Sequence, residues 1–191
     1  MNKSYQWAVI LTALIIQVSN RGFSQDTAWK SASISPDVSI YMPGPIYNVD
    51  TVQTRITTSQ CKDYLLQIKY LKPKLEVRNG DELVQAYDGF LKGYLNSKDI
   101  RLYTNTVSDT IFNGTTGKWI HSIYSRNNVF LEMYTYVVLA NSHFYMVTFA
   151  VDHLPGPKTY PAFSRYYSSL HFRNNPVKEY SGDFPPARKS N

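Results

Sequence analysis

The feature that most constrains the fold is a run of strand patterns between residues 101 and 151, interrupted only by short turns. Residues 119–124 alternate between two faces with the period of two that is typical of a β-strand. Asn113-Gly114 before them favours a tight hairpin turn. Residues 129–139 are mostly apolar on both faces, which suits a strand in the middle of a sheet. Residues 144–151 run back after a polar turn, so the pattern predicts an antiparallel sheet.

The first half of the chain carries shorter strand patterns. Residues 38–42 alternate until Pro43-Gly44-Pro45, which ends the strand because proline has no amide hydrogen to donate to a ladder. Residues 49–58 and 64–70 also alternate, and the polar stretch between them predicts a hairpin. Residues 25–33 form a polar lead-in, so the folded domain is expected to begin at residue 34.

Two segments change to a helical period. The first, residues 79–99, has Asn79 or Asp81 in position to cap its first turn. The second begins at Thr159 and ends in Ser-Leu-His-Phe, residues 169–172. This order of elements predicts an α+β class rather than alternating βαβ units. We expect a single domain over residues 34–173, with a central antiparallel β-sheet flanked by helices, and a polar C-terminal tail over 174–191. The apolar stripe of the first helix comprises Leu83, Tyr87, Phe90, Leu91, Tyr94 and Leu95, and that of the second comprises Phe163, Tyr166, Tyr167 and Leu170.

Residues 1–24 have the pattern of a secretory signal peptide. Lys3 supplies the positive region, residues 7–16 supply the apolar region, and Gly22-Phe23-Ser24 places small residues before a cut at Gln25. The apolar run is shorter than the roughly 20 residues that span a bilayer, and no cysteine follows it to carry a lipid. We therefore expect a soluble exported protein, periplasmic or extracellular, that is not a lipoprotein and has no membrane segment after cleavage.

Charge and cysteine content exclude several classes of protein. The formal net charge is +6, but Lys3 and Arg21 belong to the signal peptide and the other basic residues are dispersed. A nucleic-acid binder shows a clustered basic stripe instead, so we expect no nucleic-acid partner. Cys61 is the only cysteine, which rules out an internal disulfide. The core must therefore supply the stability.

No strong catalytic or metal motif is present. The sequence contains neither a G-x-S-x-G turn nor a phosphate-binding glycine loop. Asp152-His153 is interpreted as a polar pair at a strand end, and Cys61 as a turn thiol. His121 is predicted to be a hydrogen-bonded sheet residue. We therefore assign no catalytic, cofactor-binding or metal-binding residue and expect no cofactor. The four histidines, which form no metal-ligand spacing, are His121, His143, His153 and His171.

Tyrosine is abundant, with sixteen residues, many of them in the predicted strands and the last helix. Tyrosine buries a large ring while keeping a polar tip, so it is enriched at protein interfaces. It also suits half-buried strands, and strand propensity explains most of these positions. An aromatic binding surface remains the alternative interpretation.

The landmarks follow one another in a recognisable order. A strand ending in Met-Pro-Gly-Pro precedes a hairpin and the amphipathic helix ELVQAYDGFLKGYL. The glycine-bearing strand entry NGTTGKWIHSIY, a long apolar hairpin and the closing helix YPAFSRYYSSLHF come next. This order, over residues 34–173, resembles the PsbP-like superfamily, which includes the extrinsic PsbP subunit of photosystem II, a nuclear Ran-release factor and many small exported bacterial proteins. The resemblance implies a non-catalytic protein-binding module. The Ran-binding and photosystem-docking residues are not matched, so neither partner is carried over.

Three functions are compatible with these observations. The favoured one is an exported non-catalytic binding module that engages a protein or envelope assembly partner through its sheet rim or aromatic surface. The second is a carrier of a small apolar ligand, held between the sheet and the helix with Leu83, Tyr87 and Phe90. The third is a hydrolase that uses Asp152, His153 and Cys61.

Overall fold

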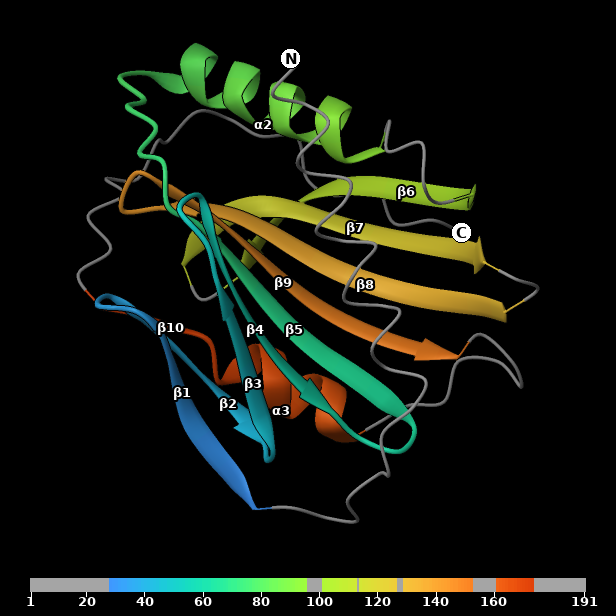
Figure 1. The fold of residues 1–191 in the computed structure, drawn as a ribbon. Coiled ribbons are helices and arrows are strands. Elements are labelled where there is room, and N and C mark those ends of the chain that lie inside the picture. Colours follow the sequence, from blue (N-terminus) through green and yellow to red (C-terminus); the bar gives the residue numbers. More distant parts are fainter. Residues whose placement is uncertain (1–27, 96–100, 113, 127–128, 153–160, 174–191) are drawn as a thin grey trace.

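The computed structural model describes residues 28–95, 101–112, 114–126, 129–152 and 161–173. They form two antiparallel sheets and two helices (Figure 1). The small sheet has the order β1-β2-β10, and the large sheet has the order β3-β4-β5-β9-β8-β7-β6. The predicted antiparallel architecture is thus confirmed. The elements are β1 (Trp29–Ser35), β2 (Val38–Pro43), β3 (Ile46–Asp50), β4 (Thr54–Gln60), β5 (Tyr64–Leu71), α2 (Gly80–Leu95), β6 (Arg101–Phe112), β7 (Thr115–Arg126), β8 (Val129–Ala140), β9 (His143–Asp152), α3 (Pro161–Ser168) and β10 (His171–Phe172).

Strand β8 lies in the interior of the large sheet, between β7 and β9, as its apolar pattern predicted. Residues 135–140 are all buried, because both faces of this strand are covered. Asn141 and Ser142 connect β8 to β9 with positive φ angles of 50° and 65°, the conformation of a two-residue hairpin turn. Gly114 in the β6–β7 connection has a φ of 74°, which a glycine adopts without strain.

Helix α2 packs on one face of the large sheet. Its Tyr87 is 3% exposed, and its hydroxyl donates to the Thr116 carbonyl at 3.2 Å and accepts the Leu139 amide hydrogen at 2.9 Å. Asn79 caps the helix, since its Oδ1 accepts the Glu82 amide hydrogen at 2.9 Å. The predicted helix is therefore confirmed, with Asn79 rather than Asp81 as its cap.

The opposite face of the large sheet is covered by the small sheet and α3. Ile34 and Ile40 of the small sheet are buried in one cluster with Val147 of β9 and Tyr166 of α3. The Tyr166 hydroxyl donates to the Gln67 carbonyl at 2.7 Å. The Tyr166 ring is thus part of the core, and its hydroxyl is satisfied by a backbone carbonyl, as buried polar groups must be.

Three strands differ from the sequence-based expectation. Strand β1 begins at Trp29, so the expected boundary at residue 34 is too late and much of the lead-in 25–33 is a strand. The single strand expected over 49–58 is two strands, because the Thr51 hydroxyl accepts the Thr54 amide hydrogen at 3.0 Å and turns the chain. The end of the last predicted helix is instead the short strand β10, which pairs with β2.

Two predicted segments, the signal peptide 1–24 and the tail 174–191, lie outside the described residues. Within the described part of the chain, neither helix is long and apolar enough to cross a membrane.

Candidate functional site

A buried carboxylate with two hydrogen-bonding partners lies in the large sheet. Glu132 of β8 is 3% exposed, and its Oε1 lies 2.7 Å from His121 Nε2. The Tyr134 hydroxyl donates to the same oxygen at 2.7 Å. Because His121 and Tyr134 are opposite each other in the β7–β8 register, and residues two apart on a strand share a face, all three side chains meet on one face. We call these three residues the Glu132 cluster.

The Glu132 cluster fixes the orientation of an imidazole that reaches the surface. The His121 side chain is 33% exposed, whereas the Glu132 side chain is 4% exposed. The His121 ring also stacks on Tyr134, with 4.6 Å between the centroids and 5° between the planes. Burial, followed by the hydrogen bond to Glu132, raises the pKa of Tyr134, so this hydroxyl stays a donor. The imidazole is therefore held at two sides, and its Nδ1 edge is the one left to contact a partner.

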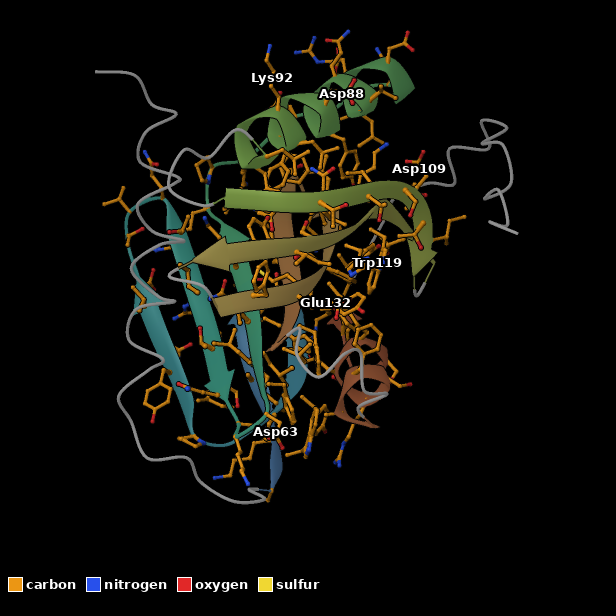
Figure 2. All side chains as sticks on the ribbon, turned by 90° about the vertical axis from the view of Figure 1, so that its right-hand side faces the viewer. Asp63, Asp88, Lys92, Asp109, Trp119 and Glu132 are labelled. Atoms are coloured by element: carbon orange, nitrogen blue, oxygen red, sulfur yellow. The ribbon has the colours of Figure 1, made fainter. Side chains whose placement is uncertain are left out.

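Aromatic rings from α3 support the cluster. Trp119 lies two residues before His121 on β7, and its ring is 5.1 Å from Tyr167 and 6.0 Å from Phe163. Phe163 also contacts Tyr134 at 5.3 Å. Figure 2 shows Trp119 and Glu132 on neighbouring strands, above α3 in that view. Rings that contact one another on several sides have little rotational freedom, so Trp119 is a rigid element of this surface.

Strand β6 extends the same face with hydroxyl groups. Thr106 is opposite His121, and Ser108 is opposite Trp119, and both hydroxyl residues are exposed. The surface formed by Trp119, His121, Thr106 and Ser108, which we call the His121 face, therefore combines an indole, an imidazole and two hydroxyls. Such a mixture of an aromatic ring with hydrogen-bonding groups is typical of protein interfaces.

The candidates for a hydrolase are only partly placed. Cys61 lies in the β4–β5 turn, where its amide hydrogen is donated to the Tyr64 carbonyl at 2.9 Å. Tyr64 pairs with Val151, so this turn lies at the sheet end where β9 finishes with Asp152. The side chain of Asp152 and the whole of His153 lie outside the described residues. A catalytic arrangement of the three therefore stays a prediction.

His143 and His171 lie apart from the Glu132 cluster. His143 Nδ1 lies 3.2 Å from the Leu71 carbonyl oxygen, and His171 is exposed on β10 of the small sheet. Within the described residues, no group of three or more acidic, histidine or cysteine side chains could hold a metal ion. The prediction that His121 is hydrogen-bonded within the sheet is confirmed. Its partner Glu132 was not foreseen.

The space between α2 and the large sheet is filled by side chains. Phe144 of β9 lies 5.4 Å from the Tyr87 ring and 4.8 Å from the Phe90 ring. Leu83 packs against the same cluster. A ligand would have to displace these rings together with the two hydrogen bonds of Tyr87. This packing argues against a carrier of an apolar ligand at that place.

Lys69 is a buried amine on the α2 side of the large sheet. It is 5% exposed, and its neighbours across the strands are Ile56 and Met146. Burial lowers its pKa to about 8, because removal from water disfavours the charged form. Apolar cross-strand neighbours explain this shift without a catalytic role.

The lowered pKa of Lys69 predicts how stability depends on pH. Between pH 8 and 10.5 the unfolded state binds more protons at this residue than the folded state, so the free energy of unfolding should rise with pH in that range. In Lys69→Met this rise should be absent or much smaller. Urea unfolding at several pH values measures it, and an equal rise in both proteins would contradict the prediction.

Comparison with known proteins supports a fold assignment. No family model matches the sequence, and no curated protein matches it. The structure is similar to the solution structure of cyanobacterial PsbP (CyanoP) from Synechocystis sp. PCC 6803, with a TM-score of 0.54 and 10% sequence identity. The match covers 82% of this chain and 99% of that chain. At this identity the likeness concerns the fold alone, and it agrees with the order of landmarks in the sequence. The chain therefore has a PsbP-like fold.

Proposed function

We propose that this protein is an exported, non-catalytic binding module that engages a protein partner of the cell envelope through the His121 face. The observation that carries the proposal is the half-exposed imidazole of His121, held by the buried Glu132 carboxylate and stacked on Tyr134. The PsbP-like fold supports a binding role, because the resemblance in the sequence implies protein-binding modules.

Glu132 is buried at a cost in free energy. Placing a carboxylate in a sheet interior is costly unless it is hydrogen-bonded, and an apolar residue would suit this strand better. The two hydrogen bonds described above join Glu132 to His121, which belongs to the His121 face, and to Tyr134, on which the His121 ring stacks. Binding ordinarily costs about 0.5–1.5 kcal/mol for each side chain that has to be immobilised. The Glu132 cluster removes much of that cost for His121.

Trp119 supplies the apolar part of the same surface. Tryptophan is among the residues that most often dominate the binding energy of an interface. Its position on a strand, braced by α3, is more precise than a position on a loop. We therefore expect a partner with an apolar side chain for Trp119 and a hydrogen-bonding group for His121.

The test begins with crosslinking in intact cells and identification of the captured protein. With that protein purified, His121→Ala should weaken binding by about 2- to 10-fold, because a hydrogen bond contributes about 0.5–1.5 kcal/mol. His171→Ala, an exposed histidine on the small sheet, is the matched control and should leave binding unchanged.

Two outcomes would contradict the proposal at different levels. If the protein is recovered alone under all crosslinking conditions, the binding function itself fails. If a partner is found but His121→Ala binds it as tightly as the unaltered protein, with an unchanged circular dichroism spectrum, the His121 face is the wrong surface.

A further inference from the structure

Strand β6 is an end strand of the large sheet and is unusually long. It terminates the strand order and has 12 residues, whereas strands commonly have about 5–6. The four residues 106–109 are all exposed, although they alternate between the two faces. Among the described strands, none other than β7 pairs with β6. Figure 2 shows Asp109 on this outer strand, with Trp119 on the neighbouring strand, lower in that view.

The usual devices that protect an edge strand are scarce in β6. Proteins prevent edge pairing with proline, lysine, bulges or short strands. Residues 101–112 contain no proline and no lysine, and the register shift between β6 and β7 lies at the start of the strand, between Leu102 and Thr104. On the α2 side, Val107 and Ile111 remain 40% and 72% exposed. Residues 104–112 thus form a regular edge with apolar side chains available for contact.

The sequence of this edge is chemically palindromic about Val107. Residues 104–110 read Thr-Asn-Thr-Val-Ser-Asp-Thr. On the two sides of Val107, Thr106 mirrors Ser108, with a hydroxyl on each. Asn105 then mirrors Asp109, and Thr104 mirrors Thr110. In an antiparallel pair of identical strands, residues at equal distances from the two-fold axis lie opposite each other. A palindrome is therefore the pattern that such a pair would use.

We propose that two copies of this chain form a dimer by antiparallel pairing of β6 with the β6 of the second copy, with the two-fold axis at Val107. The large sheet then continues through both copies. Val107 lies opposite its own counterpart, and each Asn105 lies opposite the Asp109 of the other copy. Cross-strand pairs of this kind contribute about 0.2–1 kcal/mol each, and the symmetry makes every pair except the central one occur twice.

Charge selects this register over its neighbours. A shift of two residues in one direction places the Asp109 carboxylate opposite Val107, and a shift of four places the two Asp109 residues opposite each other. Like charges directly opposite in a sheet are destabilising. In the register centred on Val107, Asp109 instead meets an amide that can donate a hydrogen bond. Asp109 also retains its ion pair with Lys118 of its own chain, with 2.5 Å between Oδ1 and Nζ.

The arrangement has a consequence for the surface of the dimer. A two-fold axis perpendicular to a continuous sheet leaves equivalent faces on the same side. Both His121 faces would then lie side by side, since Thr106 of one copy is opposite Ser108 of the other. The dimer requires only the β6 edge, so its test can fail or succeed independently of the function proposed above.

Disulfide trapping tests the register directly. In a Cys61→Ser background, Val107→Cys should form an intermolecular disulfide under mild oxidation, because opposite residues of antiparallel strands have Cα atoms about 4.5–5.5 Å apart, within the range for a disulfide. Thr104→Cys is the matched control. Two copies of position 104 would be about 20 Å apart in this register, so this variant alone should not crosslink. A mixture of Thr104→Cys with Thr110→Cys should.

The oligomeric state gives the second measurement. Sedimentation velocity of the unaltered protein should show a concentration-dependent dimer. Val107→Lys, which places two ammonium groups at the axis, should weaken the dimer at least tenfold. Val49→Lys, on the opposite edge strand β3, should not. The proposal is overturned if the protein stays monomeric at every concentration, if Val107→Cys crosslinks no better than Thr104→Cys, or if Val107→Lys leaves the dimer unchanged.

Discussion

Above pH 10 this protein should unfold cooperatively, and its buried tyrosines should ionise only as it unfolds. Burial raises the pKa of Tyr87 to about 12, with Asp109 adding a smaller effect in the same direction. Burial also raises the pKa values of Tyr166 and Tyr167 well above the usual value. These three hydroxyls donate to backbone carbonyls, and a phenolate cannot donate.

The sign of the effect follows from proton binding. Between pH 10 and 12 the unfolded chain has released the phenolic proton of Tyr87, while the folded chain still holds it. The contribution of Tyr87 to stability is therefore complete below pH 10 and is lost as the pH rises through the pKa of the folded state. The rise in the pKa of Tyr87 from 10.0 to about 12 corresponds to about 3 kcal/mol. Tyr166 and Tyr167 act in the same direction, and total stabilities are only about 5–15 kcal/mol.

Phenolate absorbance and far-ultraviolet circular dichroism, recorded together during an alkaline titration, test this expectation. The phenolate absorbance of the buried tyrosines should appear in one step with the loss of dichroism. Tyr87→Phe should be about 1–3 kcal/mol less stable at pH 7, because the Leu139 amide loses its acceptor. Between pH 10 and 12 this variant should lose less stability than the unaltered protein loses.

A matched control is Tyr41→Phe, which removes an exposed phenol and should change neither the midpoint nor the steepness of the unfolding step. If all tyrosines titrated together near pH 10 while the dichroism stayed intact, the buried hydroxyls would be accessible to solvent, and the packing of α3 on the sheet would be wrong.

The elements that could be predicted from the sequence are those whose own residues carry the burial pattern. Residues 129–139 are mostly apolar on both faces, and both faces of β8 are covered. The apolar stripe of α2 lies on the side of the helix that contacts Phe144. Strand β1 lacks such a pattern. Among its residues, Ala32 and Ile34 are its buried apolar side chains, and its strand conformation depends on pairing with β2. Pairing between segments is not visible in the local composition of one of them.

The Glu132 cluster could have been found, although only in part. An acidic residue inside the apolar run 129–139 is itself a signal, since a buried carboxylate needs hydrogen-bonding partners. Counting outward from a turn at 125–128 places His121 directly opposite Glu132. The structure instead pairs Arg126 with Val129, so His121 lies opposite Tyr134 and Glu132 is two residues away on the same face. The contribution of α3 could not be counted in this way, because Phe163 comes from a segment with no fixed spacing to β7.

Replacing Gly117 with alanine should strongly destabilise the fold, whereas the same replacement at Gly89 should stabilise it. A methyl group on Gly117 would lie 2.5 Å from the Val137 carbonyl oxygen and 2.5 Å from Tyr136 Cε2. A glycine inside a strand often marks such a close approach. On helix α2, a methyl group on Gly89 would meet nothing within 4 Å.

Neither neighbour of Gly117 can move away easily. The Val137 carbonyl belongs to β8, whose backbone is paired with β7 on one side and with β9 on the other. The Tyr136 ring is 1% exposed, and its hydroxyl donates to the Thr115 carbonyl at 2.7 Å. Overpacking of this kind costs about 1–3 kcal/mol and sometimes more. We expect the upper end of that range, because one of the two contacts is with backbone.

The comparison between the two glycines isolates the contact with β8. Both substitutions add one methyl group and restrict the unfolded chain equally, and at Gly89 that restriction, together with the better helix propensity of alanine, should add about 0.5–1 kcal/mol of stability. Urea unfolding of both variants measures the difference. If Gly117→Ala were as stable as Gly89→Ala, β7 and β8 would be further apart at Gly117 than the structure places them. Since the same strand pairing sets the register of His121 against Tyr134, that result would also weaken the assignment of the His121 face.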